Sequence, residues 1–583
     1  MAQAPAHTLG IDLGTTNCAL AFVAESGALE LLPIPQLVGA GEVRAEPLLP
    51  SFLYLPGPNE FGDGALNLPW PQTGGAIAGK FAQRRGLENS GRLVASAKSW
   101  LSYSGVDRSA ALLPWQAPEG VPTISPVAAS SRYLRHLRDA WDQAHPEAPF
   151  EQQEVLVTVP ASFDEVAREL TQQAAEQAGY RNLTLLEEPQ AAFYAWLGRH
   201  ANWRELVGVG DLVLVIDIGG GTTDFSLIAV TEHSGDLQLG RVAVGEHILL
   251  GGDNIDLALA HAVAGRLAER GQRVDKFQLQ ALWNHCRAAK EKLLEPGSTA
   301  AEVAVTILGK GSGLVGGSIK AALTRADVDL VLEGFFPHVA ADDLPQKRRG
   351  GLLELGLPYA ADAAVTRHLA RFLATAKQGE AVRPTHVLFN GGVLHAQFVR
   401  ERLLQVLQSW YSQPVRALEG EDLMHAVARG AAYYGAARRG TGVRIRGGIS
   451  RSYYVGIESA MPAVPGLAPP VKALAVAQFG MEEGSDVRVP ARPFGLVTGE
   501  AAEFRFFSST VRKDDAPGEV IEDLRGELQE MSPMQVELPG AGGVVPVTFE
   551  TVVTETGLLQ LWCVAADGRR WKLEFNVRER VGA

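Results

Sequence analysis

Cysteine is scarce in this 583-residue chain, and its positions form no recognisable pattern. The three cysteines, Cys18, Cys286 and Cys563, lie far apart, are odd in number and form no Cys-x-x-Cys pair. This spacing supports neither a disulfide framework nor a zinc site, and it favours a reducing compartment. The 13 histidines show no metal-ligand spacing either.

Long apolar runs and an excess of positive charge are missing as well. No run approaches the ~18 residues that a membrane helix needs, and the N-terminal MAQAPAHTLGIDLG has neither a basic segment nor a long apolar core. The net charge is -13, which disfavours nucleic acid or an anionic membrane as the main partner. We therefore predict a cytoplasmic protein that binds neither nucleic acid nor membranes.

Glycine, in contrast, is abundant, with 63 residues. The apolar content of 46% and the charged content of 20% are ordinary for a globular protein. A glycine excess without low-complexity repeats indicates tight turns or close contacts between backbone and ligand. The chain is too long for one hydrophobic core, so we expect several packing units.

One sequence motif occurs twice in the chain. Residues Ile11–Asn17 read IDLGTTN, and residues Ile216–Asp224 read IDIGGGTTD. Each is an apolar strand that ends in an aspartate and a Gly/Thr turn. Such turns bring backbone N–H groups and hydroxyls onto phosphate oxygens. Asp12 and Asp217 would repel those phosphates unless a cation intervenes, which suggests Mg²⁺ held directly or through its waters. We predict a duplicated half-domain on each side of a nucleotide cleft.

The spacing of apolar residues divides the rest of the chain into a mixed helix-and-strand region and a strand-rich region. We predict strands at 155–159, 211–218 and 386–390, and helices at 164–178 and 424–437, within a domain that spans 1–437. A basic, Gly-rich linker follows at 438–448. Beyond it the period becomes two, and Asp567-Gly568 separates two alternating runs, which is a strong hairpin signal. We predict a separate antiparallel β domain at 449–583.

The order of several motifs resembles that of the Hsp70 chaperone family. The motifs are GIDLGTTNCAL, VTVPASFDEVAR, LLEEPQAAFYAW, VIDIGGGTTDFSL, LLGGDNID and VLFNGGVLHA. The resemblance covers nearly the whole chain and is strongest over 8–260. It implies an α/β actin-like ATPase domain, with two duplicated ribonuclease-H-like lobes around a nucleotide cleft, followed by an all-β sandwich. Related actin-like ATPases and sugar kinases share the two phosphate turns, but not the trailing β domain.

The resemblance also implies roles for residues at matching positions. Asp12 and Asp217 match Mg²⁺-associated carboxylates, and Lys98 matches a lysine that orients the γ-phosphate. Glu188 and Asp224 match carboxylates that position water and metal, so the implied catalytic residues are Lys98, Glu188, Asp217, Thr222 and Asp224. The implied contacts to ATP or ADP are Gly14, Thr15, Thr16, Asn17, Gly219, Gly220, Gly221, Thr222, Gly251, Gly252, Asp253, Lys290, Gly391 and Gly392.

A further pair, Pro160 and Arg168, matches residues that relay nucleotide state to the second domain. Taken from the residues alone, other interpretations stay open for several of these positions. Lys98 could equally be a solvated lysine, Glu188 a turn residue before a proline, and Arg168 an exposed helical arginine.

The adenine end departs from the family pattern. On the helix that carries CRAAKEKLLE, Lys290 is kept, but Arg287, Glu291 and Glu295 stand where the family has glutamate, arginine and serine. Arg287 and Glu291 are four residues apart and can still attract each other. His395 replaces a second arginine, so the usual arginine sandwich around adenine is missing. Base preference is therefore open.

The segments expected to couple the two domains also differ from the family pattern. The linker is basic rather than acidic and aliphatic, and Thr184 stands where an arginine would contact a J-domain co-chaperone, so that contact is doubtful. Asp253 is one methylene shorter than the usual glutamate. We expect no helical lid, so bound peptide would be released quickly. The segment 340–360 has no counterpart that we can place.

The leading hypothesis is a divergent Hsp70-type ATPase. It would bind and hydrolyse ATP with Mg²⁺ and thereby control binding of an extended apolar polypeptide by the β domain. The alternative is a non-catalytic, nucleotide-sensing scaffold that docks one dedicated partner. An actin-like filament protein fits less well, because filaments do not require a C-terminal sandwich.

Overall fold

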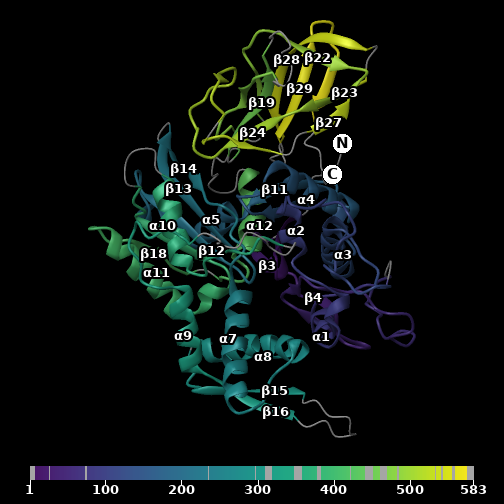
Figure 1. Ribbon diagram of the computed structural model, residues 1–583, viewed down its shortest axis with the longest axis vertical. Coiled ribbons are helices and arrows are strands. Elements are labelled where there is room, and N and C mark those ends of the chain that lie inside the picture. Colours follow the sequence, from purple (N-terminus) through teal and green to yellow (C-terminus); the bar gives the residue numbers. More distant parts are fainter. Residues whose placement is uncertain are drawn as a thin grey trace.

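Figure 1 shows the computed structural model, in which two α/β lobes lie side by side and an all-β domain sits across one end of them. The structure describes residues 7–573 apart from 25, 72–74, 234–235, 296, 309–317, 347–356, 377–381, 421, 440–448, 450, 460–468, 482–484, 525, 532–533, 540–541 and 555–558. Much of the predicted segment 340–360 and most of the predicted linker lie outside the described residues.

The first lobe is built on a mixed sheet with strand order β11-β10-β1-β2-β3. β1 (Thr8–Leu13) pairs antiparallel with β2 (Asn17–Val23), which pairs antiparallel with β3 (Leu29–Leu31). On its other side β1 pairs parallel with β10 (Glu154–Val159), and β10 pairs parallel with β11 (Leu183–Glu187). The central strands are almost entirely buried, as expected of a sheet that is covered on both faces.

The second lobe repeats this arrangement, with strand order β18-β17-β12-β13-β14. β12 (Leu212–Ile218) pairs antiparallel with β13 (Thr223–His233), which pairs antiparallel with β14 (Asp236–Val244). β12 also pairs parallel with β17 (His386–Asn390), and β17 pairs parallel with β18 (Arg416–Leu418). Because the order and directions match strand for strand, the predicted duplication of the half-domain is confirmed.

The helices of the two lobes cover these sheets and bring the lobes together. They are α2 (Ala97–Ser102), α3 (Pro126–Ala144), α4 (Glu165–Gln177), α5 (Glu188–Arg199), α6 (Trp203–Leu206), α10 (Val365–Thr375), α11 (Gln397–Trp410) and α12 (Ala426–Arg438). The predicted helix at 164–178 corresponds to α4, where the Asp164 side chain accepts a hydrogen bond from the Ala167 N–H at 2.8 Å and caps the first turn.

Small residues let α12 lie directly against its neighbours. A Cβ atom on Gly430 would lie 1.7 Å from the Ala191 carbonyl oxygen of α5. A Cβ atom on Gly10, in β1, would lie 2.2 Å from the Ala428 oxygen of α12. These approaches exclude any larger side chain, so α12 links the first sheet to α5 through backbone contact.

Two smaller assemblies flank the cleft at the end away from the β domain (Figure 1). In the second lobe they are α7 (Gly252–Glu269), α8 (Lys276–Leu294), β15 (Glu302–Leu308), β16 (Ser318–Thr324) and α9 (Arg325–Phe335). In the first lobe they are β4 (Ile34–Gly39), β5 (Glu42–Glu46), β6 (Leu49–Pro50), β7 (Leu53–Tyr54), β8 (Ile77–Ala78), α1 (Lys80–Glu88) and β9 (Leu93–Val94).

The C-terminal part of the described chain is all β. One sheet has the order β25-β20-β19-β24-β26 and another has β21-β28-β29-β30, with β22 also paired to β28 and β23 paired to β27. The strands are β19 (Ser452–Glu458), β20 (Val471–Ala477), β21 (Asp486–Arg488), β22 (Phe494–Thr498), β23 (Ala501–Phe504), β24 (Phe506–Ser509), β25 (Val520–Ile521), β26 (Gln529–Glu530), β27 (Met534–Glu537), β28 (Gly543–Val553), β29 (Leu559–Ala565) and β30 (Arg570–Leu573).

The Asp567-Gly568 turn joins β29 and β30 in the predicted hairpin, with Gly568 at φ 89°. The last residues of the predicted alternating run, beyond Leu573, lie outside the described residues. The fold class predicted from the sequence is therefore confirmed. The domain limits 1–437 and 449–583, and the absence of a lid, stay predictions. None of the helices in the described part is both long and apolar enough to cross a bilayer.

The β domain contacts both lobes. Glu165, at the start of α4, is 4% exposed, and it accepts hydrogen bonds from the Tyr453 hydroxyl at 2.9 Å and the Leu559 N–H at 3.2 Å. Lys513 donates to the Val242 carbonyl oxygen of the second lobe. Phe163 and residues of β19 and β29 belong to one continuous buried cluster. Burial raises the pKa of Glu165 although Arg168 lies nearby.

We predict that Glu165→Ala destabilises the docked β domain, because it removes the buried carboxylate that accepts hydrogen bonds from the Leu559 N–H and the Tyr453 hydroxyl. The expected cost is about 1–3 kcal/mol in the free energy of unfolding. Urea unfolding followed by circular dichroism measures it, with Glu176→Ala on the exposed side of the same helix as the control. Tyr453→Phe combined with Glu165→Ala must be non-additive; simple addition would show that the two side chains do not interact.

Candidate functional site

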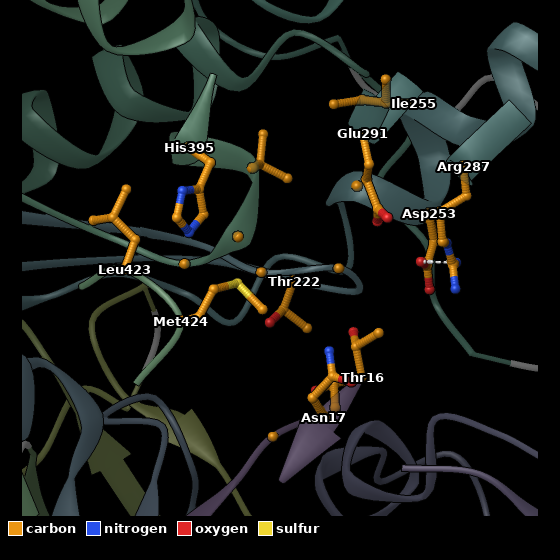
Figure 2. Close-up of a pocket in the computed structure, with 18 of the residues that line it drawn as sticks. Thr16, Asn17, Thr222, Asp253, Ile255, Arg287, Glu291, His395, Leu423 and Met424 are labelled. Carbon is orange, nitrogen blue, oxygen red and sulfur yellow. Dashed lines mark hydrogen bonds and ion pairs between the residues drawn. The ribbon is translucent and has the colours of Figure 1, made fainter. Parts of the chain in front are cut away.

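A cavity of about 720 Å³ lies between the two lobes, and Figure 2 shows part of its lining. This volume falls in the range of small-molecule and cofactor sites. Most of the residues that the sequence predicted for the site line it together: Asp12, Gly14, Thr15, Thr16, Asn17, Lys98, Glu188, Asp217, Gly219, Gly220, Thr222, Gly252, Asp253, Lys290, Gly391 and Gly392. Gly221, Asp224 and Gly251 do not line this cavity but lie beside it.

The first turn joins β1 to β2 and is held by its neighbours. The Ser51 hydroxyl donates to the Gly14 carbonyl oxygen at 2.7 Å, and the Ser51 N–H donates to the Thr16 oxygen at 2.8 Å. A Cβ atom on Gly14 would lie 2.1 Å from the Asn17 oxygen, so the tight turn admits only glycine. The turn therefore presents Thr15, Thr16 and Asn17 to the cavity.

The second turn joins β12 to β13, and the N-terminus of α7 stands on it. The Gly219 N–H donates to the Thr222 oxygen at 2.9 Å. The Gly252 and Asp253 N–H groups donate to the Gly219 and Gly220 oxygens at 3.0 and 2.7 Å. A Cβ atom on Gly251 would lie 2.6 Å from the Gly219 oxygen, which explains why a pair of glycines begins this helix.

The two turns lie next to each other at one end of the cavity, and Figure 2 shows Thr16 close to Thr222. They also touch at one edge, because a Cβ atom on Gly220 would lie 2.2 Å from Thr16 Oγ1 and one on Gly221 would lie 2.8 Å from Thr15 Cγ2. The extra glycine of the second turn therefore makes room for the threonines of the first.

A third glycine turn follows β17 and completes the floor. Gly391 has φ 94°, and a Cβ atom there would lie 2.7 Å from Asp217 Oδ1 and 2.4 Å from the Ile218 oxygen. The preceding Asn390 donates from Nδ2 to Asp217 Oδ2 at 2.7 Å. This turn fixes the orientation of Asp217 at the end of β12.

Half-buried carboxylates crowd one end of the cavity. Burial raises the pKa of Asp12 to about 7, with Lys98 opposing and Glu188 adding to the shift. Burial, reinforced by Glu188, Asp224 and Asp12, raises the pKa of Asp217 to about 8. Such crowding of negative charge in a place with little solvent requires a compensating cation for these groups to ionise at neutral pH.

Lys98 is the cation closest to this group. It is 6% exposed and its Nζ forms an ion pair with Glu188 Oε1. Burial opposes its charge, but the attraction of Glu188 and Asp12 is stronger, so the pKa of Lys98 lies above its ordinary value. Burial likewise raises the pKa of Glu188, which Lys98 partly offsets. The surface interpretation of Lys98 is therefore wrong, because this side chain is buried in the cleft.

Asp224 is held by two residues that the sequence analysis did not identify. His247 Nδ1 lies 3.0 Å from Asp224 Oδ1, and the Ser162 hydroxyl donates to the same oxygen at 2.8 Å. Burial alone would raise the pKa of Asp224, but His247 and Ser162 outweigh it and the pKa is lowered. The position of His247 four residues before the Gly251-Gly252 pair is the one signal in the sequence that could have pointed to it.

The residues fit a magnesium ion. Within the described chain, no group of three or more His, Cys, Asp or Glu side chains is arranged to enclose a metal by itself. Mg²⁺ keeps several of its waters and is bound through one or two carboxylates together with phosphate oxygens. Asp12 and Asp217, at the ends of equivalent strands beside the two phosphate turns, provide that donor set.

The far end of the cavity carries an ion-pair network that differs from the predicted one. Arg287 donates from Nε to Asp256 Oδ2 at 2.9 Å and also pairs with Asp253. Lys290 Nζ lies 2.7 Å from Asp256 Oδ1. The expected attraction between Arg287 and Glu291 forms no ion pair, because the two aspartates of α7 bind the guanidinium instead.

The predicted relay pair lies where the lobe meets the β domain. Arg168 is 6% exposed, and it donates to Glu187 Oε1 at 2.6 Å and to the Phe163 oxygen at 3.3 Å. Pro160 lines a small cavity of about 10 Å³ together with Glu188, Asp217 and Asp224. The exposed interpretation of Arg168 is therefore wrong.

Comparison with known proteins agrees with this geometry. The sequence profile of the family described as Hsp70 protein matches residues 77–340. The chain is Hsp70-like. Curated relatives named "Chaperone protein HscA homolog" are 30% identical over 337 residues in Bordetella pertussis and 32% identical over 333 residues in Pseudomonas paraeruginosa. Each match covers 56% of this chain and 46% of the relative, so this Hsp70-like chain matches about half the length of these relatives.

We predict that binding of preformed Mg²⁺·ATP releases protons at pH 6.5 and releases fewer at pH 8.5. The folded-state pKa values of Asp12 and Asp217, about 7 and about 8, lie above the ordinary 3.8. In the metal-free chain their contribution to stability is therefore present below about pH 4 and lost as pH rises towards 8, whereas the metal favours the ionised form.

Calorimetric titration in buffers of different ionisation enthalpy measures this proton release. Asp217→Asn should lower the number of protons released at pH 6.5, and Asp63→Asn, on the exposed surface, should leave it unchanged. The same number of protons at both pH values, or no effect of Asp217→Asn, would contradict the assignment.

Proposed function

We propose that this Hsp70-like chain is an ATP-dependent molecular chaperone. It binds and hydrolyses ATP with Mg²⁺ to control the binding of extended apolar polypeptide segments by its β domain. The observation that carries this proposal is the pair of Gly/Thr turns that meet at one cavity, which Lys98, Asp12 and Asp217 also line.

The turns bind the triphosphate from two sides. Backbone N–H groups of the glycines and the hydroxyls of Thr15, Thr16 and Thr222 donate to phosphate oxygens. When bound, Mg²⁺ supplies positive charge that neutralises those oxygens. Asp12 and Asp217 would hold the ion through one or two carboxylate oxygens or through its waters.

The hydrolytic step rests on the buried charges beside the turns. Glu188 keeps the Lys98 ammonium in place, so that it stabilises negative charge developing on the γ-phosphate. Asp224 stays ionised because His247 and Ser162 hold its oxygens, and it can accept a hydrogen bond from the attacking water. The cavity of about 10 Å³ between Glu188, Asp217 and Asp224 has room for about one water molecule.

The segment from Pro160 to Arg168 is suited to report nucleotide state to the β domain. Ser162 contacts Asp224 at the site, while Glu165, three residues later, bonds the Tyr453 hydroxyl and the Leu559 N–H of the β domain. Arg168 anchors the same segment to Glu187, the neighbour of Glu188. A shift of this segment by the nucleotide would alter the contacts of the β domain.

The partners follow from this proposal. An unfolded or extended polypeptide, or one dedicated client protein, would bind the β domain in the cytoplasm. Co-chaperones are possible partners, but the J-domain position is occupied by Thr184, which is 7% exposed and accepts a hydrogen bond from Arg438 at 3.0 Å. Thr184 itself therefore offers no cation to an acidic partner, and the cation beside it is Arg438.

We predict that the wild-type chain hydrolyses ATP only with Mg²⁺ and that Lys98→Ala lowers turnover about 10²-fold, because it removes the buried cation at the γ-phosphate. A steady-state phosphate-release assay measures both. Lys80→Ala, an exposed lysine outside the cavity, is the matched control. A mutant that hydrolyses ATP as fast as wild type would rule out this role for Lys98.

We further predict that extended apolar peptides bind the full chain and that ATP weakens their binding, whereas Arg168→Ala reduces this effect of ATP without abolishing nucleotide binding. Fluorescence anisotropy with several unrelated labelled peptides measures the affinities. Failure of every peptide, together with tight binding of one folded protein, would support the scaffold alternative instead.

A further inference from the structure

We call the end of the cavity that lies away from the phosphate turns the base end, because the nucleotide base would lie there. Figure 2 shows Thr16 and Thr222 at one side of the cavity, with Glu291 and His395 facing each other at the other. Ile255 lies beside Glu291 and provides apolar surface for a flat ring. A triphosphate held by the turns therefore places its base between Glu291 and His395.

The two cationic side chains at this end, Arg287 and Lys290, form ion pairs with aspartates of α7. Arg287 is bound by Asp253 and Asp256, and Lys290 is bound by Asp256, which is 1% exposed. Moving either cation over a base would leave the buried Asp256 carboxylate without its counter-charges, which is costly. Neither side chain is free to stack on the ring of a nucleotide.

Two polar side chains are left to contact the base. Among the described residues, neither the Glu291 carboxylate nor the His395 imidazole has a hydrogen-bond or ion-pair partner, and both are exposed. An ionised carboxylate only accepts hydrogen bonds, whereas a neutral imidazole offers one donor. This end of the cavity therefore offers two acceptor oxygens on α8 and one donor on the opposite wall.

The purine bases differ in how they match such a site. Guanine presents two adjacent donors, N1–H and the N2 amino group, which a carboxylate accepts together, and its O6 and N7 accept from an imidazole. Adenine presents one amino donor beside the N1 lone pair, which a carboxylate oxygen repels. Charge-assisted hydrogen bonds in pairs are among the strong ones.

We propose that the base end accepts guanine at least as well as adenine, so that this chain binds and hydrolyses GTP as well as ATP. The proposal rests on the proposed function of the same cleft. In the step, the water oxygen forms a bond to the γ-phosphorus while the bond from that phosphorus to the bridging oxygen breaks. GDP leaves with the electron pair of that bond, and the water proton is released with inorganic phosphate.

Calorimetric titration of the full chain with Mg²⁺ complexes of GTP, ITP and ATP tests this. We expect GTP to bind at least as tightly as ATP and ITP, which lacks the N2 amino group, to bind several-fold more weakly than GTP. Glu291→Gln should weaken GTP about tenfold and strengthen ATP, because an amide both donates to adenine N1 and accepts from its amino group. Glu269→Gln, which removes the same charge from α7 outside the cavity, should change neither.

The outcomes separate the two levels of the proposal. ATP binding several-fold tighter than GTP binding, or an unchanged GTP-to-ATP ratio in Glu291→Gln, overturns the base assignment and leaves the proposed function standing. No binding of any of the three nucleotides overturns the proposed function itself. If Glu291→Gln does not fold, equal affinities of wild type for GTP and ITP overturn the contact with the N2 amino group.

Discussion

The arrangement of the cleft depends on the burial of negative charge where the two lobes meet. Asp12 and Asp217 end equivalent strands of the two sheets, so the duplicated fold itself brings two carboxylates to one place. Glu188 and Asp224 add to that charge, and Lys98 offsets part of it. Carboxylates in such a place are costly unless a cation neutralises them. The fold therefore carries an electrostatic cost that a magnesium-bound polyphosphate relieves.

That electrostatic centre is connected to the β domain over a short distance in the sequence. The segment that follows β10 contacts the carboxylates through Ser162 and the β domain through Glu165. The Glu165 hydrogen bond joins buried groups and the Ser162 hydrogen bond joins partly buried ones, so breaking either contact costs free energy. Lys513 adds a contact to the second lobe. A domain that touches both lobes restrains how far they can rotate.

The sequence predicted the parts of this structure that rest on local patterns. The Asp-x-Gly turns, the Asp164 cap and the Asp567-Gly568 hairpin are each determined by a few neighbouring residues, and the structure contains all three. The topology that the two lobes share agrees with the predicted duplication, although the strand order itself was not predicted. These elements fix the phosphate end of the site.

The contacts that the sequence did not predict join residues far apart in the chain. His247 lies in the segment between β14 and α7 and approaches Asp224 of β13, and no spacing rule links the two. Arg287 forms no ion pair with Glu291, which lies four residues later on the same helix. Its guanidinium binds the carboxylates of Asp253 and Asp256 on another helix instead. An ion pair between residues four apart on a helix contributes a few tenths of a kcal/mol to stability. Binding of one guanidinium by two carboxylates contributes more.

This contrast explains why the two ends of the cavity differ in how well they tolerate amino-acid substitutions. Several glycines of the phosphate turns admit no side chain, since a Cβ atom on Gly220, Gly251 or Gly391 would collide with the backbone or side chain of another turn. Substitution there disrupts the lobes as well as the ligand site. Glu291 and His395 contact no polar partner among the described residues, so replacing either alters the base contact and little else. Recognition of the phosphates is thus tied to the fold, whereas recognition of the base rests on a few exposed side chains.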